Sequence, residues 1–211
     1  MWMIGTFVIL IFSAIVHEVS HGLMAEQLGD NTAREEGRIT LNPISHIDPY
    51  GTLLLPLIMW VATGGRFFFG SAKPVPVNFS RLKNPKLGML LVSLAGPLSN
   101  FILALVMVVP IKLGLVNQIS YPFLLLGIYI NLLLGTFNLI PIPPLDGSKI
   151  LAALLPSQWT IKILDLEKYG FLLVLVFVFL NWFGYVLLPV VEGFWRITGL
   201  SLADLFTVLS H

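Results

Sequence analysis

A long apolar segment that contains two histidines is the feature that most restricts the fold of this chain. Residues 2–28 are mainly hydrophobic, yet they include His17-Glu18-Val19-Ser20-His21. A helix of this length can cross a hydrocarbon core of about 30 Å with some tilt. Ionisable side chains inside such a helix are unfavourable and mark a functional site by default. The segment therefore predicts a membrane helix that carries a functional site.

The spacing of the two histidines predicts a metal site on one face of that helix. An α-helix turns once in about 3.6 residues, so His17 and His21 point the same way, about one turn apart. Two imidazoles in this arrangement form a pair of metal ligands. Glu18 lies beside them and can take a proton from a water at the metal without binding the metal itself.

The composition is that of an integral membrane protein. Of the 211 residues, 56% are hydrophobic and only 11% are charged, whereas soluble domains carry about 25% charged residues. The absence of cysteine excludes disulfides, a thiolate nucleophile and cysteine-based metal sites, so every ligand must be His, Asp or Glu. With a net charge of +1 and no dense basic run, no nucleic-acid partner is expected.

The apolar segments predict an all-α polytopic membrane protein with about four transmembrane helices. The four predicted spans are residues 2–28, 87–111, 121–140 and 170–191. Residues 51–63 are apolar but too short to span and contain Pro56, which indicates a re-entrant segment. Two short interfacial helices are expected at residues 147–155 and 157–168.

Two further elements are predicted outside the spans. Residues 38–41 alternate weakly in polarity and indicate a short strand. Residues 192–211 predict a surface helix that follows a Ser201 cap and has leucines on one face. No repeat or linker divides the chain, so residues 1–211 are expected to form a single membrane-embedded domain.

Asp146 is the candidate for a third metal ligand. It follows the segment 121–140, behind three prolines within residues 141–144 that cannot continue a helix. Asp146 can reach the depth of the histidines only if residues 51–63 enter the membrane and return on the same side. That topology puts ten of the twelve lysines and arginines on one side, which the positive-inside rule makes the cytoplasm. These ten are Arg34, Arg38, Arg66, Lys73, Arg81, Lys83, Lys86, Lys149, Lys162 and Lys168.

The predicted topology is thus a multi-pass protein of the cell (plasma) membrane. Its site would lie near the cytoplasmic face, and both termini would lie outside. Two histidines and one carboxylate leave a fourth zinc position open, as in catalytic rather than structural zinc sites. The reaction class that this predicts is hydrolysis of a peptide bond.

Several motifs in the chain resemble the site-2 protease family of intramembrane zinc metalloproteases. They are His17-Glu18-Val19-Ser20-His21, Leu41-Asn42-Pro43, Ala72-Lys73-Pro74-Val75-Pro76, Ala95-Gly96-Pro97 with Asn100, and Asn138-Leu139-Ile140-Pro141-Ile142-Pro143-Pro144-Leu145-Asp146-Gly147. The resemblance extends over about residues 13–150. Because no PDZ-like or CBS-like domain is evident, the chain resembles a minimal member of the family.

The resemblance implies a ligand set and a substrate class. One Zn²⁺ per chain would be held by His17, His21 and Asp146, with Glu18 as the catalytic acid and base. Asn138 matches the family asparagine implicated in contacts to substrate or oxyanion. The implied partners are the lipid bilayer and a transmembrane protein substrate, cleaved within or near a membrane-spanning segment, often after an earlier cut by another protease.

Other interpretations of the same residues stay open at the level of sequence. Asp146 can equally cap the helix that follows it, and Asn100 and Asn138 can link helices by hydrogen bonds. A membrane divalent-metal transporter would also place histidine and acidic residues inside helices, but at several depths along a route. A catalytically inactive membrane scaffold would keep the fold without the chemistry, although intact Glu18 and both histidines speak against it.

Overall fold

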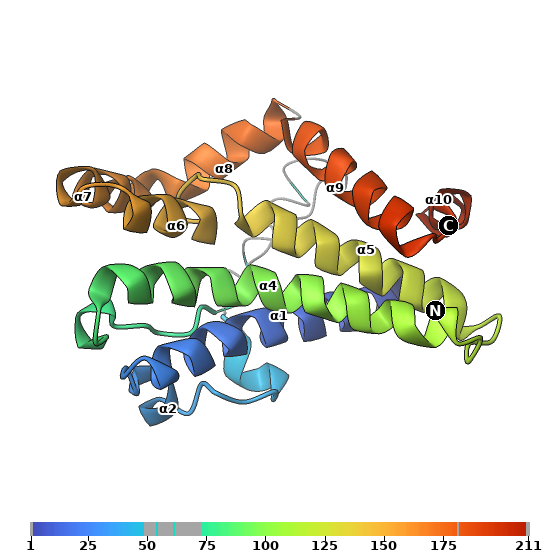
Figure 1. The fold of residues 1–211 in the computed structure, drawn as a ribbon, viewed down its shortest axis with the longest axis horizontal. Coiled ribbons are helices and arrows are strands. Elements are labelled where there is room, and N and C mark those ends of the chain that lie inside the picture. Colours follow the sequence, from blue (N-terminus) through green and yellow to red (C-terminus); the bar gives the residue numbers. More distant parts are fainter. Residues whose placement is uncertain (1, 49–53, 55–60, 62–72, 181, 210–211) are drawn as a thin grey trace.

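Three long apolar helices form the centre of the fold. They are α1 (Trp2–Gln27), α4 (Pro85–Lys112) and α5 (Ser120–Asn138), and each is long and apolar enough to cross a membrane. The computed structural model describes residues 2–48, 54, 61, 73–180 and 182–209, and among these residues there is no strand. Figure 1 shows the three helices along the long axis of the molecule, with α4 packed against both α1 and α5. The chain is thus an all-helical membrane protein.

Local sequence explains where α4 begins and how closely it approaches α5. The Asn84 side chain accepts a hydrogen bond from the backbone N–H of Leu87 at 3.2 Å, and Pro85 occupies the first helical position. Gly135 of α5 faces α4, and a Cβ there would lie 3.1 Å from the ring of Phe101. A glycine at this position therefore allows the two helices to pack closely.

Short helices connect and flank the long ones. They are α2 (Thr32–Glu35), η1 (Pro43–His46), η3 (Phe79–Arg81), α6 (Asp146–Leu154), α7 (Ser157–Asp165), η4 (Leu166–Tyr169) and α10 (Leu202–Leu209). Helices are therefore present at both positions where interfacial helices were predicted. The predicted strand at residues 38–41 is wrong, because the Arg38 N–H bonds to the Ala33 carbonyl at 2.8 Å and closes the turn after α2.

The predicted span at residues 170–191 is not one helix. The structure has α8 (Gly170–Phe179) and α9 (Trp182–Thr198), which meet at an angle in Figure 1. The two halves bury their apolar side chains in different places. In α8, Val174 and Phe177 pack near Ile140, while Trp195 of α9 packs against α5. Because each half has its own packing partner, the chain bends between them, and neither half is among the three candidate spans.

The C-terminal part differs from the predicted surface helix in where the helix begins and in the burial of one of its faces. Residues 192–198 continue α9, and α10 begins only at Leu202. The Ser201 hydroxyl accepts a hydrogen bond from the Asp204 N–H at 3.3 Å, which confirms the predicted cap. Leu205 is 1% exposed and packs in the core beside α5. The helix therefore buries one face against the protein.

The ends of the helices divide the molecule into two poles. Figure 1 shows both termini at one end of the long axis and α2 and α7 at the other. The predicted re-entrant segment, residues 51–63, falls almost entirely outside the described residues.

Candidate active site

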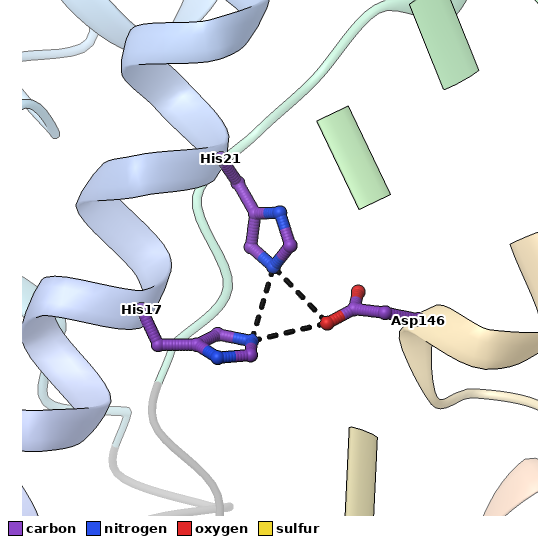
Figure 2. Close-up of side chains that lie close together, drawn as sticks. All are labelled: His17, His21 and Asp146. Carbon is purple, nitrogen blue, oxygen red and sulfur yellow. Dashed lines mark hydrogen bonds and ion pairs between the residues drawn. The ribbon is translucent and has the colours of Figure 1, made fainter. Parts of the chain in front are cut away.

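Two helices bring three potential ligands to one point. His17 and His21 of α1 and Asp146 of α6 point toward one another (Figure 2). Asp146 Oδ2 lies 3.0 Å from His17 Nε2 and 3.2 Å from His21 Nε2, and the two Nε2 atoms are 3.1 Å apart. All three residues are buried. Within the described part of the chain, no other group of three His, Asp or Glu side chains converges in this way.

The orientation of both imidazoles is fixed by acceptors on their far side. His17 Nδ1 lies 2.6 Å from the side-chain oxygen of Asn100, and His21 Nδ1 lies 2.6 Å from the Val92 carbonyl. A carbonyl oxygen can only accept, so each Nδ1 carries a hydrogen, and in the neutral imidazole each Nε2 then presents a lone pair. This is the form in which histidine binds a metal.

The three converging atoms fit a zinc ion. When both imidazoles are neutral, two lone pairs and a carboxylate oxygen converge here, an arrangement that a cation between them stabilises. Tetrahedral zinc with bonds of about 2.0–2.1 Å has ligand atoms about 3.3 Å apart, close to the three distances of 3.0–3.2 Å. A Cβ at Gly96 would lie 2.4 Å from His21 Nε2 and 2.6 Å from His17 Nε2. Glycine therefore keeps the space beside the ligands open.

Asn100 belongs to a buried polar network that joins three helices. Its Nδ2 donates to the Ser13 carbonyl at 3.3 Å and to Asn131 Oδ1 at 3.0 Å. Asn131 Nδ2 in turn donates to Ser13 Oγ and to the Gly127 carbonyl, each at 2.9 Å. Asn100, Asn131 and Ser13 are 0% exposed. Asn100 therefore links helices and orients His17 at the same time, whereas sequence alone singled out neither Ser13 nor Asn131.

The Asp146-Gly147 pair explains how α6 presents its carboxylate. Leu145 occupies the N-cap position, and the hydrogen bonds of the Asp146 side chain to described residues are those with His17 and His21. The capping alternative is therefore wrong. A Cβ at Gly147 would lie 2.3 Å from the Leu139 carbonyl oxygen and 2.4 Å from that of Ile140. Only glycine lets the first turn of α6 sit this close to the end of α5, which directs Asp146 toward the histidines.

Glu18 lies on the same turn of α1 as the ligands but contacts a different part of the chain. Its Oε2 accepts a hydrogen bond from the Val75 N–H at 2.8 Å, and no described residue bonds to its Oε1. Both Glu18 and the ligands line a pocket of about 210 Å³. Asn138 also lines this pocket, although its side-chain amide donates to the Leu134 carbonyl at 3.0 Å. The pocket thus brings the predicted base, ligands and asparagine together.

Ser93 is a further polar residue on the pocket wall. It is 1% exposed, and its hydroxyl has no hydrogen-bond partner among the described residues. In sequence it was only one of several small residues of α4, so nothing there distinguished it.

Residues 73–78, here called the strap, cross the pocket in an extended, non-helical segment. One end is held by Asp30, whose Oδ2 accepts from the Asn78 N–H at 2.6 Å. Burial raises the pKa of the Asp30 carboxyl, but hydrogen bonds from Thr32 and Asn78 and the nearby Arg81 charge outweigh it, so the pKa is lowered. Asp30 is therefore an ionised anchor of the strap.

Comparison with known proteins gives consistent matches to zinc metalloproteases. The family model described as peptidase family M50 matches residues 110–181. The putative zinc metalloprotease YwhC of Bacillus subtilis is 39% identical over 193 residues, which cover 87% of this chain and 84% of that protein. The putative zinc metalloprotease Rip2 of Mycolicibacterium smegmatis is 30% identical, over 82% of this chain and 67% of that protein.

A zinc metalloprotease of Methanocaldococcus jannaschii, MJ0392, is 31% identical over 79% of this chain and 36% of its own length. No solved structure matches the chain.

Proposed function

The chain belongs to peptidase family M50 and is a zinc metalloprotease, and from that premise we propose that it hydrolyses a peptide bond within or near a transmembrane segment of another membrane protein. The observation that carries the proposal is that two members of the buried His17, His21 and Asp146 cluster, the histidines, lie on a helix long enough to cross a membrane. A site in such a helix lies at the depth of the bilayer, where a membrane-spanning substrate is present and a soluble substrate is not.

The proposed roles of the side chains follow from their contacts. His17, His21 and Asp146 hold one Zn²⁺ per chain through the three converging atoms. When bound, the ion supplies Lewis-acid polarisation and makes water more acidic. Glu18 lies beside the ligands with one oxygen unoccupied by described residues, so it takes the proton of the attacking water and returns it to the leaving nitrogen.

The substrate must present an extended segment to this pocket. Peptide groups within a membrane helix are hydrogen-bonded to one another, so the helix must unwind locally before a carbonyl can react. Asn138 on the pocket wall is the proposed contact to the substrate or to its oxyanion, because its side-chain amide can exchange the Leu134 carbonyl for a stronger acceptor.

The proposed orientation places the active site near the cytoplasmic face of the cell membrane. Both termini lie at one end of the molecule (Figure 1), as they must if an even number of crossings joins them. In this proposal α8 and α9 together make the fourth crossing, and both termini lie outside. The end that carries α2 and α7 then faces the cytoplasm with most lysines and arginines.

Two other functions are less consistent with these observations. A divalent-metal transporter needs ligands at several depths, whereas one converging cluster occurs among the described residues. An inactive scaffold needs neither a base beside the ligands nor a pocket that exposes it, and both are present.

The decisive experiment compares the wild-type protein with Glu18→Gln in lipid vesicles that contain a single-span peptide with a fluorophore and a quencher. Cleavage with zinc should fall by about 10²- to 10⁴-fold in the variant, the usual contribution of a general base, while bound zinc per chain is unchanged. Glu36→Gln is the matched control, because Glu36 is exposed on the surface.

Each outcome separates the three functions. Persistent cleavage in Glu18→Gln would remove Glu18 from the mechanism. Zinc flux into vesicles without cleavage would favour the transporter. The absence of both cleavage and zinc flux would favour the scaffold. A comparison of membrane-protein fragments in cells that express either protein extends the same test to natural substrates.

A further inference from the structure

Arg38 is a buried cation without a carboxylate partner in the described part of the chain. It is 5% exposed, and its guanidinium donates to two backbone carbonyls, those of Lys73 at 2.7 Å and Pro74 at 3.3 Å. Its Nε has no partner among the described residues. A buried guanidinium is unfavourable unless its environment compensates the charge. Both carbonyls that Arg38 contacts belong to the start of the strap, so Arg38 holds this segment in place.

The second carbonyl belongs to the peptide group that contacts Glu18. Arg38 donates to the oxygen of Pro74, and the N–H at the other end of the same peptide group, that of Val75, donates to Glu18 Oε2 at 2.8 Å. A cation thus lies at the oxygen end of one amide dipole and an anion at its N–H end. Each hydrogen bond polarises the amide in the direction that strengthens the other.

The other strap contacts hold its two ends, and the Pro74–Val75 peptide group between them contacts Glu18. The Lys73 N–H donates to the His46 carbonyl at 2.9 Å, and the Asn78 N–H donates to Asp30. Pro74 and Pro76 have no N–H and a fixed φ. The contacts at the two ends of the strap therefore direct the Val75 N–H toward the active site.

We propose that Arg38 is a positioning residue for the carboxylate of Glu18, acting through the Pro74–Val75 peptide group. Arg38 holds the peptide so that its N–H occupies Oε2 of Glu18, which directs the other oxygen, Oε1, toward the reacting water. This inference rests on the proposed function, in which Glu18 is the acid and base, and it adds a residue that neither spacing nor sequence motif indicated.

The first measurement is amide hydrogen exchange in the strap, which needs no substrate. Because Pro74 and Pro76 lack amide hydrogens, a peptide over residues 74–77 reports only Val75 and Val77. Arg38→Gln should accelerate exchange at Val75 by about ten-fold or more, the effect of weakening one hydrogen bond to a charged group. Arg38→Lys, which keeps the charge, should remain close to the wild-type rate.

The second measurement is turnover of the same fluorogenic single-span peptide in vesicles. Arg38→Gln should lower kcat by about 10- to 100-fold with little change in KM, because the base is misplaced while the pocket persists. Zinc per chain should stay at the wild-type value, and Arg38→Lys should restore most of the turnover. Arg34→Gln is the control, because the exposed Arg34 pairs with Glu26, makes no contact to the strap among the described residues and should change neither readout.

A second variant approaches the same contact from the other end. Val75→Pro deletes the N–H donor and leaves Arg38 in place. If both residues act through one peptide group, the combined variant should lose little more turnover than either single variant. Fully multiplicative losses would overturn the proposal. If Arg38→Gln does not fold, Val75→Pro alone still tests the contact, and wild-type turnover in that variant would overturn the proposal.

The remaining outcomes distinguish this inference from the proposed function. If Glu18→Gln is inactive but Arg38→Gln matches the wild type in exchange and turnover, only the role of Arg38 is wrong. If Arg38→Gln loses zinc together with turnover, Arg38 supports the fold in general and the proposal fails. If wild-type protein and Glu18→Gln behave alike toward the peptide, the proposed function fails, and the exchange rates still decide whether Arg38 holds the strap.

Discussion

The two sides of one helical turn in α1 are held in different ways. The side that carries His17 and His21 packs against α4, and its imidazoles bond to Asn100 and to the Val92 carbonyl inside the helix bundle. The side that carries Glu18 meets an extended strap and is held there by one backbone N–H. The proposed ligands are therefore positioned by helix packing, and the proposed base by a connecting segment.

In the proposed function, this difference separates metal binding from catalysis. A ligand set fixed by three packed helices requires little rearrangement when an ion binds. A base held by a strap can move with that segment when substrate enters, because loops open at lower free energy than packed helices do. Changes on the helix side should therefore alter metal affinity, and changes on the strap side should alter turnover at constant metal content.

The largest effect is expected from Asp146→Ala. This change removes one of three ligand atoms and leaves the two imidazoles converging without their anionic partner. Loss of a residue that only supports a metal ligand lowers affinity by about 10- to 100-fold. Loss of the ligand itself should lower zinc affinity by far more. Metal analysis of the purified protein measures this, with the exposed Asp165→Asn as control. Retention of one zinc per chain would exclude Asp146 as a ligand.

Gly96→Ala tests whether the space beside the ligands is required. Its methyl group would lie within 2.6 Å of both Nε2 atoms, so α4 or the imidazoles must move. We expect strong loss of zinc with a smaller change in the melting temperature. Gly193→Ala is the matched control, because a Cβ at Gly193 meets nothing within 4 Å. Equal zinc content in the two variants would contradict the geometry of the site.

Asn131→Leu tests the buried network at a residue that reaches His17 only through Asn100. It deprives Asn100 and Ser13 of hydrogen-bond partners, so zinc affinity should fall by about 10- to 100-fold and stability by about 1–3 kcal/mol. Zinc titration and thermal unfolding measure the two effects. Thr136→Val provides the control on the same helix, since the buried Thr136 hydroxyl has no partner in the described structure. A loss of turnover with unchanged zinc affinity would contradict the expectation that changes on the helix side act through metal binding.

Asp30→Asn gives the smallest expected effect, and it acts on the strap side. Because the folded-state pKa of Asp30 is lowered, its stabilisation is present above the unfolded pKa of about 3.9 and is lost as the pH falls through the folded value. At neutral pH the variant should be less stable by roughly 1 kcal/mol. The difference from the wild type should shrink below about pH 4. Melting temperatures at several pH values test this, and a difference that does not change with pH would rule out the carboxylate as its source.

The long helices and the histidine pair could be predicted because their signals are local. Apolar length predicted α1, α4 and α5 within a few residues, and the spacing of His17 and His21 put both on one face. Asp146 required more, namely a matching depth in the membrane and a family resemblance. The break between α8 and α9 was missed, because an apolar run does not indicate that its halves have different packing partners.

The sequence by itself predicted that a membrane helix carries two metal ligands and a base, because the helical repeat converts spacing directly into direction. Only the tertiary structure decided what holds those side chains: a carbonyl of α4, an asparagine network across three helices, and a peptide N–H of the strap. Any residue can supply a backbone N–H or carbonyl, so such contacts leave no signature in the sequence. They arise when segments far apart in the chain pack together.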